Sequence, residues 1–219
     1  MREIKAFILD LDGVVTDTAE YHYQAWKKLA DEESVPFTRE DNEHLRGVSR
    51  RRSLELLLGD YIQRYTEEEI NTLMARKNSY YQSMLAKISE ADFLPGASAL
   101  LNDLRACHMK IAIGSASKNT RTVLSQLGIL DFFDGISDGY AVERAKPEPD
   151  VFIYAAGAMG VPVINCVVVE DAKSGVQAAL TAGMVAVGIG PQARVGIAHF
   201  RYDSTADIDL EEIMRGEIS

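Results

Sequence analysis

The sequence predicts an α/β protein in which a Rossmann-like core with a parallel sheet carries an inserted, all-helical cap domain. Short apolar segments alternate with amphipathic helical patterns over much of the chain, whereas residues 18–92 show helical patterns alone. The length of 219 residues and the 47% content of hydrophobic residues are sufficient for a substantial buried interior. We therefore expect one large core with a smaller helical insertion.

Four apolar segments are the predicted strands of the sheet. Their residues are almost all apolar, which is typical of strands buried on both faces. The segments cover residues 6–11, 110–115, 166–171 and 185–190. Helical patterns between them cover residues 97–106, 119–127, 150–159 and 174–182. Because strands and helices alternate, the pattern predicts a parallel sheet covered by helices.

The helical insertion interrupts this alternation. Charged and apolar residues mix at helical spacing across it, and no clear buried strand occurs. We predict a helical cap domain over residues 16–92 and an α/β core formed by residues 1–15 and 93–219. The polar stretch after Val15 and the Leu94-Pro95-Gly96 turn are the expected hinges between the two lobes. The tail at residues 206–214 fits either a final strand and helix or a looser extension.

Composition and charge exclude several classes of protein. The formal net charge of −10 disfavours nucleic acid or an anionic membrane as a partner. No apolar run approaches the roughly 20 residues that span a bilayer, and the N-terminus lacks the features of a signal peptide. We expect a cytoplasmic monomer, although sequence leaves the oligomeric state open. Cys107 and Cys166 lack metal-ligand spacing, so we expect packing roles rather than a disulfide or zinc site.

Polar side chains follow three of the predicted strands at their carboxyl ends, where ligands bind in open parallel sheets. Asp10 and Asp12 follow the first strand, Ser115 ends the second, and Glu170 with Asp171 ends another. Acidic groups that meet there would repel one another unless a cation lay between them, and Mg²⁺ fits oxygen ligands of this kind. The alternative is that Asp12 and the following glycine only mark a turn.

Two further segments favour an anion. The motif SASKN closes the second strand and opens a helix, where hydroxyls, free amides and the helix dipole favour an anion, although an ordinary helix cap would look the same. Lys146 lies in a charged loop, and Pro147 fixes the backbone directly after it. A lone loop lysine is usually solvated. Its role in binding therefore depends on the motifs around it.

The motifs DLDGVVTDT, SASKN, Lys146-Pro147 and VVEDAKSG, in this order, resemble the four signature motifs of the haloacid dehalogenase-like superfamily. The segments TAEYHYQAW, LRGVSRRRSLE and ARKNSYY resemble the helical cap of the sugar phosphomutases in that superfamily. The resemblance implies interconversion of β-D-glucose 1-phosphate and D-glucose 6-phosphate through a phospho-aspartate and glucose 1,6-bisphosphate. It also implies Mg²⁺ as cofactor and sugar phosphates as partners.

The resemblance assigns roles by position. Asp10 is the implied nucleophile, and Asp12 is the implied general acid/base. The implied metal ligands are Asp10, the main-chain carbonyl of Asp12, Glu170 and Asp171. The implied substrate-binding residues are His22, Gly47, Arg50, Ser53, Lys77, Ser115, Ala116, Ser117, Lys118, Asn119 and Lys146.

Residue chemistry leaves alternatives beside this mutase interpretation. A helix histidine such as His22 is often a packing residue, and Arg51 and Arg52 replace the acidic residues expected there. Both arginines fit a solvated surface, or they could tighten anion binding or loosen selectivity. Arg50 together with SASKN offers a second phosphate grip, which a mutase needs and a phosphatase does not. The remaining alternatives are a Mg²⁺-dependent sugar-phosphate phosphatase and a non-catalytic sugar-phosphate-binding protein.

Overall fold

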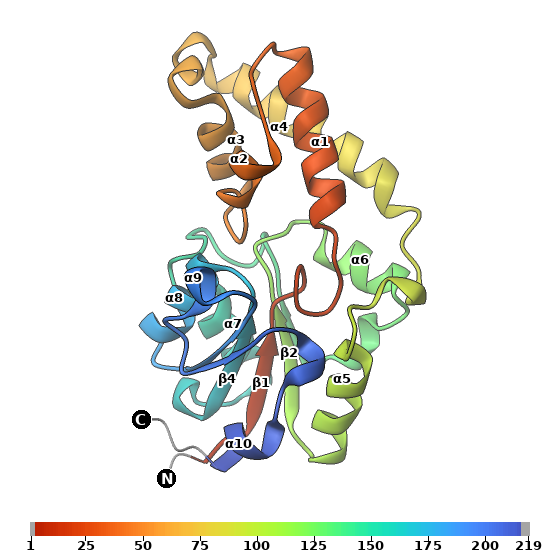
Figure 1. The fold of residues 1–219 in the computed structure, drawn as a ribbon, viewed down its shortest axis with the longest axis vertical. Coiled ribbons are helices and arrows are strands. Elements are labelled where there is room, and N and C mark those ends of the chain that lie inside the picture. Colours follow the sequence, from red (N-terminus) through yellow and green to blue (C-terminus); the bar gives the residue numbers. More distant parts are fainter. Residues whose placement is uncertain (1–2, 216–219) are drawn as a thin grey trace.

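A six-stranded parallel sheet forms the centre of the molecule (Figure 1). The structure is a computed structural model that describes residues 3–215. Its strand order is β3-β2-β1-β4-β5-β6. The strands are β1 (Ala6–Leu9), β2 (Lys110–Gly114), β3 (Gly135–Ser137), β4 (Cys166–Glu170), β5 (Val185–Ile189) and β6 (Phe200–Tyr202). The α/β fold with a parallel sheet is confirmed.

The helices surround the sheet and form a second lobe beyond its carboxyl edge. The α-helices are α1 (Ala19–Glu32), α2 (Arg39–Glu43), α3 (Arg50–Leu58), α4 (Glu67–Leu85), α5 (Ala97–Ala106), α6 (Thr120–Gln126), α7 (Asp150–Met159), α8 (Lys173–Thr181), α9 (Gln192–Val195) and α10 (Leu210–Arg215). The 3-10 turns are η1 (Gly59–Arg64), η2 (Glu90–Asp92), η3 (Leu130–Phe132), η4 (Val163–Asn165) and η5 (Thr205–Asp207). Within the described residues, the tail at 206–214 forms the end of η5 and α10 rather than a strand.

The central strand β1 shows why the predicted strands are apolar throughout. Phe7 and Leu9 point to one face, where they pack with residues of α5 and α6. Ala6 and Ile8 point to the opposite face and pack with residues of α7 and α8. Both faces of the sheet are therefore buried, and a polar residue at any of these positions would lack a partner.

Helices α1 to α4 and their connections form what we call the cap lobe, which lies above the carboxyl edge of the sheet in Figure 1. It has its own apolar cluster, with Trp26, Leu54 and Leu58 fully or almost fully buried. The C-terminal part of α4 instead joins the apolar cluster of the sheet through Tyr81 and Leu85. The predicted domain boundaries remain a prediction, and their outermost residues, 1–2 and 216–219, lie outside the described residues.

The two cysteines and the lengths of the helices bear on expectations from the sequence. The expected packing role of Cys107 is wrong, because this residue is exposed just after α5, whereas Cys166 is buried in β4. Between residues 3 and 215, no helix combines the length and apolarity needed to cross a membrane.

Candidate active site

Lys146 binds two acidic side chains at the carboxyl edge of the sheet. Its Nζ atom donates to Asp10 Oδ1 at 2.9 Å and to Glu170 Oε1 at 2.6 Å, and its side chain is fully buried. Burial alone would lower the pKa of Lys146, but the neighbouring Asp10 and Glu170 carboxylates raise it above its usual value. Lys146 is therefore a permanent buried cation rather than the solvated loop lysine of the alternative interpretation.

Three carboxylates form a compact oxygen cluster beside this lysine. Ligand atoms of Asp10, Glu170 and Asp171 all lie within 4.8 Å of one another, and all three residues are buried. Burial raises the pKa of Glu170 and of Asp171, and the neighbouring Asp10 raises both further. Lys146 pairs with Asp10 and Glu170, and close-set oxygen donors of this kind are what hard divalent cations bind. The cluster therefore fits a divalent metal ion.

Asp12 lies at the start of the connection to the cap lobe, where it meets two hydroxyl groups. The Thr18 hydroxyl donates to Asp12 Oδ1, and Tyr81 Oη donates to Thr18 Oγ1 at 2.9 Å. Although its side chain keeps some exposure to the cavity, burial raises the pKa of Asp12 to about 7, while the bond from Thr18 opposes the rise. A carboxyl group that titrates near neutrality suits general acid/base catalysis.

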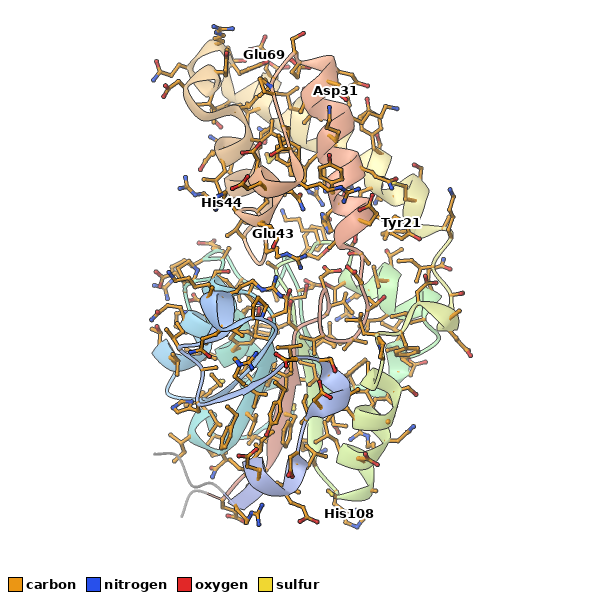
Figure 2. All side chains as sticks on the ribbon, in the orientation of Figure 1. Tyr21, Asp31, Glu43, His44, Glu69 and His108 are labelled. Carbon is orange, nitrogen blue, oxygen red and sulfur yellow. The ribbon has the colours of Figure 1, made fainter. Side chains whose placement is uncertain are left out.

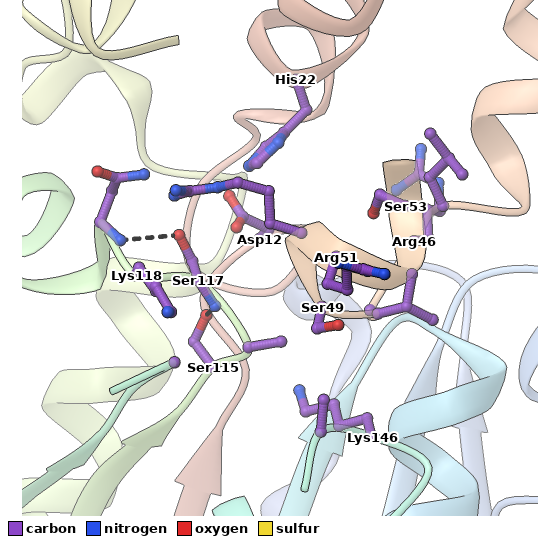
Figure 3. A pocket seen from close by; sticks show the side chains of 18 of the residues that line it. Asp12, His22, Arg46, Ser49, Arg51, Ser53, Ser115, Ser117, Lys118 and Lys146 are labelled. Carbon is purple, nitrogen blue, oxygen red and sulfur yellow. Dashed lines mark hydrogen bonds between the residues drawn. The ribbon is translucent and has the colours of Figure 1, made fainter. Parts of the chain in front are cut away.

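A cavity of about 690 Å³ opens between the two lobes above these carboxyl groups. Figure 3 shows Ser115, Ser117 and Lys118 on one side of it, and Ser49, Arg51 and Ser53 of the cap lobe on the other. Ser117 and its neighbours form a tight loop: Ser117 N donates to Ser115 Oγ at 3.1 Å, and Asn119 N donates to Ser117 Oγ at 3.1 Å. The loop places hydroxyl and amide groups along one wall of the cavity.

His22 and Lys77 meet at the top of the same cavity. Lys77 Nζ lies 2.9 Å from His22 Nδ1, and the ammonium stacks over the rings of Trp26 and Tyr81 at 4.7 and 4.8 Å. Burial lowers the pKa of both His22 and Lys77, and each is lowered further by a neighbouring cation. His22 is thus a cavity residue, not the packing residue of the alternative interpretation.

The three consecutive arginines of α3 have different partners. Arg50 Nη2 donates to Asn78 Oδ1 at 2.7 Å and faces the cavity. Arg51 forms ion pairs with Glu55 at 2.9 Å and Glu67 at 2.6 Å. The side chain of the exposed Arg52 forms an ion pair with Glu55 at 3.2 Å. The solvated interpretation therefore describes Arg52 better than Arg51.

Gly47 lies where the cap lobe comes closest to the core. Its φ of +68° is in the left-handed region, and a Cβ atom there would lie 2.7 Å from Ser174 Oγ and 2.8 Å from Ala172 Cβ. Only glycine allows this approach. The close contact positions the following helix α3, and with it Arg50 and Ser53, beside the sheet edge.

Arg46 connects the cap lobe to the carboxylate cluster. Its Nη1 donates to Asp171 Oδ2 at 3.0 Å, and its Nε donates to Glu43 Oε2 at 3.0 Å. Arg194 approaches the same two acidic residues, at 3.9 Å from Asp171 and 3.5 Å from Glu43. Figure 2 shows Glu43 at the end of the cap lobe that faces the core. This contact was not predicted, because it joins residues 125 positions apart in the sequence.

Comparison with known proteins agrees with this geometry. The model of the haloacid dehalogenase-like hydrolase family matches residues 4–183. The chain belongs to this family. It is 42% identical over 210 residues to the β-phosphoglucomutase of Bacillus subtilis, covering 95% of this chain and 93% of that protein. It is also 27% identical to a phosphorylated carbohydrates phosphatase of Thermotoga maritima, covering 96% and 97% of the two chains.

Solved structures of the haloacid dehalogenase-like family support the fold. The β-phosphoglucomutase of Clostridium difficile superposes with a TM-score of 0.93 at 41% sequence identity, covering 97% of this chain and 96% of that chain. The superposed regions therefore include both the sheet and the cap lobe.

The structure brings together the residues that the family motifs select in this haloacid dehalogenase-like chain. Each predicted catalytic or substrate-binding residue lines the cavity. Glu170 completes the carboxylate cluster beneath it. The roles assigned to these residues stay predictions. The motifs did not single out Thr18, Arg46 or Asn78 as site residues. Each of them forms a hydrogen bond with a side chain that is distant in the sequence.

Proposed function

We propose that the chain is a Mg²⁺-dependent β-phosphoglucomutase that interconverts β-D-glucose 1-phosphate and D-glucose 6-phosphate through glucose 1,6-bisphosphate. The observation that carries the proposal is that one cavity is lined both by Asp10 and Lys146 of the core and by Arg50 and Asn119. A mutase must bind two phosphate groups of one bisphosphate, and the presence of both sets of residues in one cavity supports this proposal. The mutases among the chain's relatives support the same activity.

In this proposal Asp10 is the nucleophile. Its carboxylate attacks the phosphorus atom, and Lys146 with Ser115 holds the phosphoryl oxygens. The proposed Mg²⁺ ligands are Asp10, the main-chain carbonyl of Asp12, Glu170 and Asp171. When bound, Mg²⁺ supplies charge that reduces the repulsion between a carboxylate and a phosphate dianion.

Asp12 is the proposed general acid/base for the sugar hydroxyl groups. Its pKa of about 7 allows it to donate a proton in one half-reaction and to accept one in the other. His22 and Lys77 would contact the sugar, while Arg50, Ser117, Lys118 and Asn119 would hold the distal phosphate. We propose that residues 16–92 act as a cap that closes over the substrate; cytoplasmic location and a monomeric state remain predictions.

A coupled assay tests this function. β-Glucose 1-phosphate, Mg²⁺ and a catalytic amount of the bisphosphate should yield glucose 6-phosphate in a dehydrogenase-coupled reaction. The Asp10→Asn variant should lose this activity and remain folded, because the amide is isosteric but a weak nucleophile and Lys146 keeps its ion pair with Glu170. Release of inorganic phosphate without glucose 6-phosphate would contradict the mutase proposal and favour the phosphatase activity named for the Thermotoga relative.

A further inference from the structure

Asn78 of α4 joins the two lobes through the cavity residues Arg50 and Asn119. Its Oδ1 atom accepts a hydrogen bond from Arg50 Nη2 at 2.7 Å and another from Asn119 Nδ2 at 2.9 Å. Arg50 belongs to the cap lobe, whereas Asn119 ends the SASKN loop of the core. One acceptor atom therefore connects two of the groups proposed to hold the distal phosphate.

The same helix also sets the orientation of the Asn119 amide group. Gln82 lies one turn after Asn78 on α4, and its Nε2 donates to Asn119 Oδ1 at 3.2 Å. Asn78 accepts from the Nδ2 side of Asn119, and Gln82 donates to its Oδ1 side. These opposite polarities allow only one orientation of the amide, and the second N–H of Nδ2 remains available for an anion.

Asn78 is uncharged, and this matters for the charge of Arg50 as much as its position does. Among the described residues, no ion pair joins Arg50 to an acidic group, whereas the adjacent Arg51 pairs with both Glu55 and Glu67. Burial lowers the pKa of Arg50, with no carboxylate to offset that effect. An amide oxygen orients the guanidinium without cancelling its charge. Arg50 therefore keeps its full charge for a phosphate.

We propose that Asn78 is a positioning residue for the distal phosphate: it aligns Arg50 with Asn119 only when α4 rests against the SASKN loop. Phosphate affinity thereby depends on contact between the two lobes. Gln82 assists by holding the amide of Asn119 in its donating orientation. This inference deepens the proposed function, because the anion concerned is the distal phosphate of the sugar phosphate.

Two substitutions at Asn78 separate geometry from charge. Asn78→Ala removes the shared acceptor and should weaken binding of glucose 6-phosphate about tenfold. Asn78→Asp preserves the shape and both hydrogen bonds but places a carboxylate against Arg50, so affinity should fall about 100-fold. For a purely structural asparagine the order would be reversed, because the isosteric aspartate would be the milder change.

Gln82→Glu tests the orientation of the amide group. Glutamate cannot donate to Asn119 Oδ1, and it would accept from Nδ2 instead, which favours the rotated amide. We expect a several-fold loss of affinity in this variant. Ser79→Ala is the matched control on α4, because Ser79 is exposed and its hydroxyl donates to the Arg76 carbonyl oxygen of the same helix.

Calorimetric titration with glucose 6-phosphate, together with kcat and KM for β-glucose 1-phosphate, tests the positioning role of Asn78. We expect KM and the dissociation constant to rise together, kcat to change less than threefold, and Ser79→Ala to match the unsubstituted chain. Equal affinity in Asn78→Ala, Asn78→Asp and the unsubstituted chain would overturn the role of Asn78 while leaving mutase activity intact. Absence of mutase activity in the unsubstituted chain would instead refute the proposed function, and the titrations would still test Asn78.

Discussion

Replacing Lys146 by methionine should strongly destabilise the protein at neutral pH in the absence of divalent cations. The fully buried Lys146 ammonium contacts Asp10 at 2.9 Å and Glu170 at 2.6 Å. Methionine retains most of the side-chain volume but leaves both carboxylates and the nearby Asp171 without this cation. Breaking a buried ion pair by removing one partner costs about 3–5 kcal/mol. For a chain of this size, that corresponds to a fall in Tm of about 6 to 20 °C.

The size of this loss should depend on pH in a defined direction. Burial raises the pKa of Glu170 and Asp171 in the folded state, and Lys146 opposes this rise. Without Lys146 both pKa values rise further, so the folded variant takes up protons more readily than the unfolded chain. Acidification from pH 7 to pH 5 neutralises the uncompensated carboxylates. The stability difference between the variant and the unsubstituted chain should therefore shrink.

Urea denaturation at pH 7 and pH 5, in the presence of a chelator, measures both effects. Lys110→Met is the matched control, because Lys110 pairs with Asp134 at 2.9 Å on the surface, with 54% of its side chain exposed. That substitution should cost at most about 1 kcal/mol. A loss below about 1 kcal/mol for Lys146→Met at pH 7, or an equal loss at both pH values, would refute the role assigned to the buried cation.

Three further predictions concern the cap lobe and its contacts. Arg46→Ala should tighten Mg²⁺ binding about tenfold, because the guanidinium occupies Asp171 Oδ2 at 3.0 Å; calorimetry without substrate measures this, and weaker binding would count against it. Lys77→Met should raise Tm at pH 7, because burial lowers the pKa of Lys77 and the unfolded chain binds the proton more tightly. The gain should shrink above about pH 10, where the unfolded lysine also loses its proton. Thr18→Val removes the hydrogen bond that lowers the pKa of Asp12. In Mg²⁺-saturated enzyme, the limb of the pH profile of kcat/KM that reports Asp12 should therefore move to higher pH. An unchanged pH profile would exclude Asp12 as the titrating group.

Local sequence patterns predicted the central part of the fold because they report burial directly. The strand β1 is apolar at every position since Phe7 and Ile8 face different apolar clusters. The strands β3 and β6 escaped prediction for the opposite reason. Each has three residues, lies at an edge of the sheet and is incompletely buried, so no recognisable pattern of burial develops.

The motifs also predicted which residues gather at the cavity, but not how these residues are held. Asp12 was identified from its spacing to Asp10. Its carboxylate accepts a hydrogen bond from the Thr18 hydroxyl, which in turn accepts one from the hydroxyl of Tyr81, a residue 63 positions further along the chain. Asn78 follows Lys77 within a motif and was not singled out. Its importance depends on contacts with residues 28 and 41 positions away, which no local pattern records.

The run of arginines from Arg50 to Arg52 shows how the fold separates residues that are equivalent in sequence. All three carry the same charge near the start of the same helix, so composition cannot select the one that binds phosphate. Arg51 and Arg52 have carboxylate partners, and these offset their charge. Arg50 has the amide oxygen of Asn78 instead, so its charge stays uncompensated beside the cavity. An anion gains most from the cation whose field no carboxylate cancels, so the ion pairs of the helix favour Arg50 for phosphate, as the family motif does.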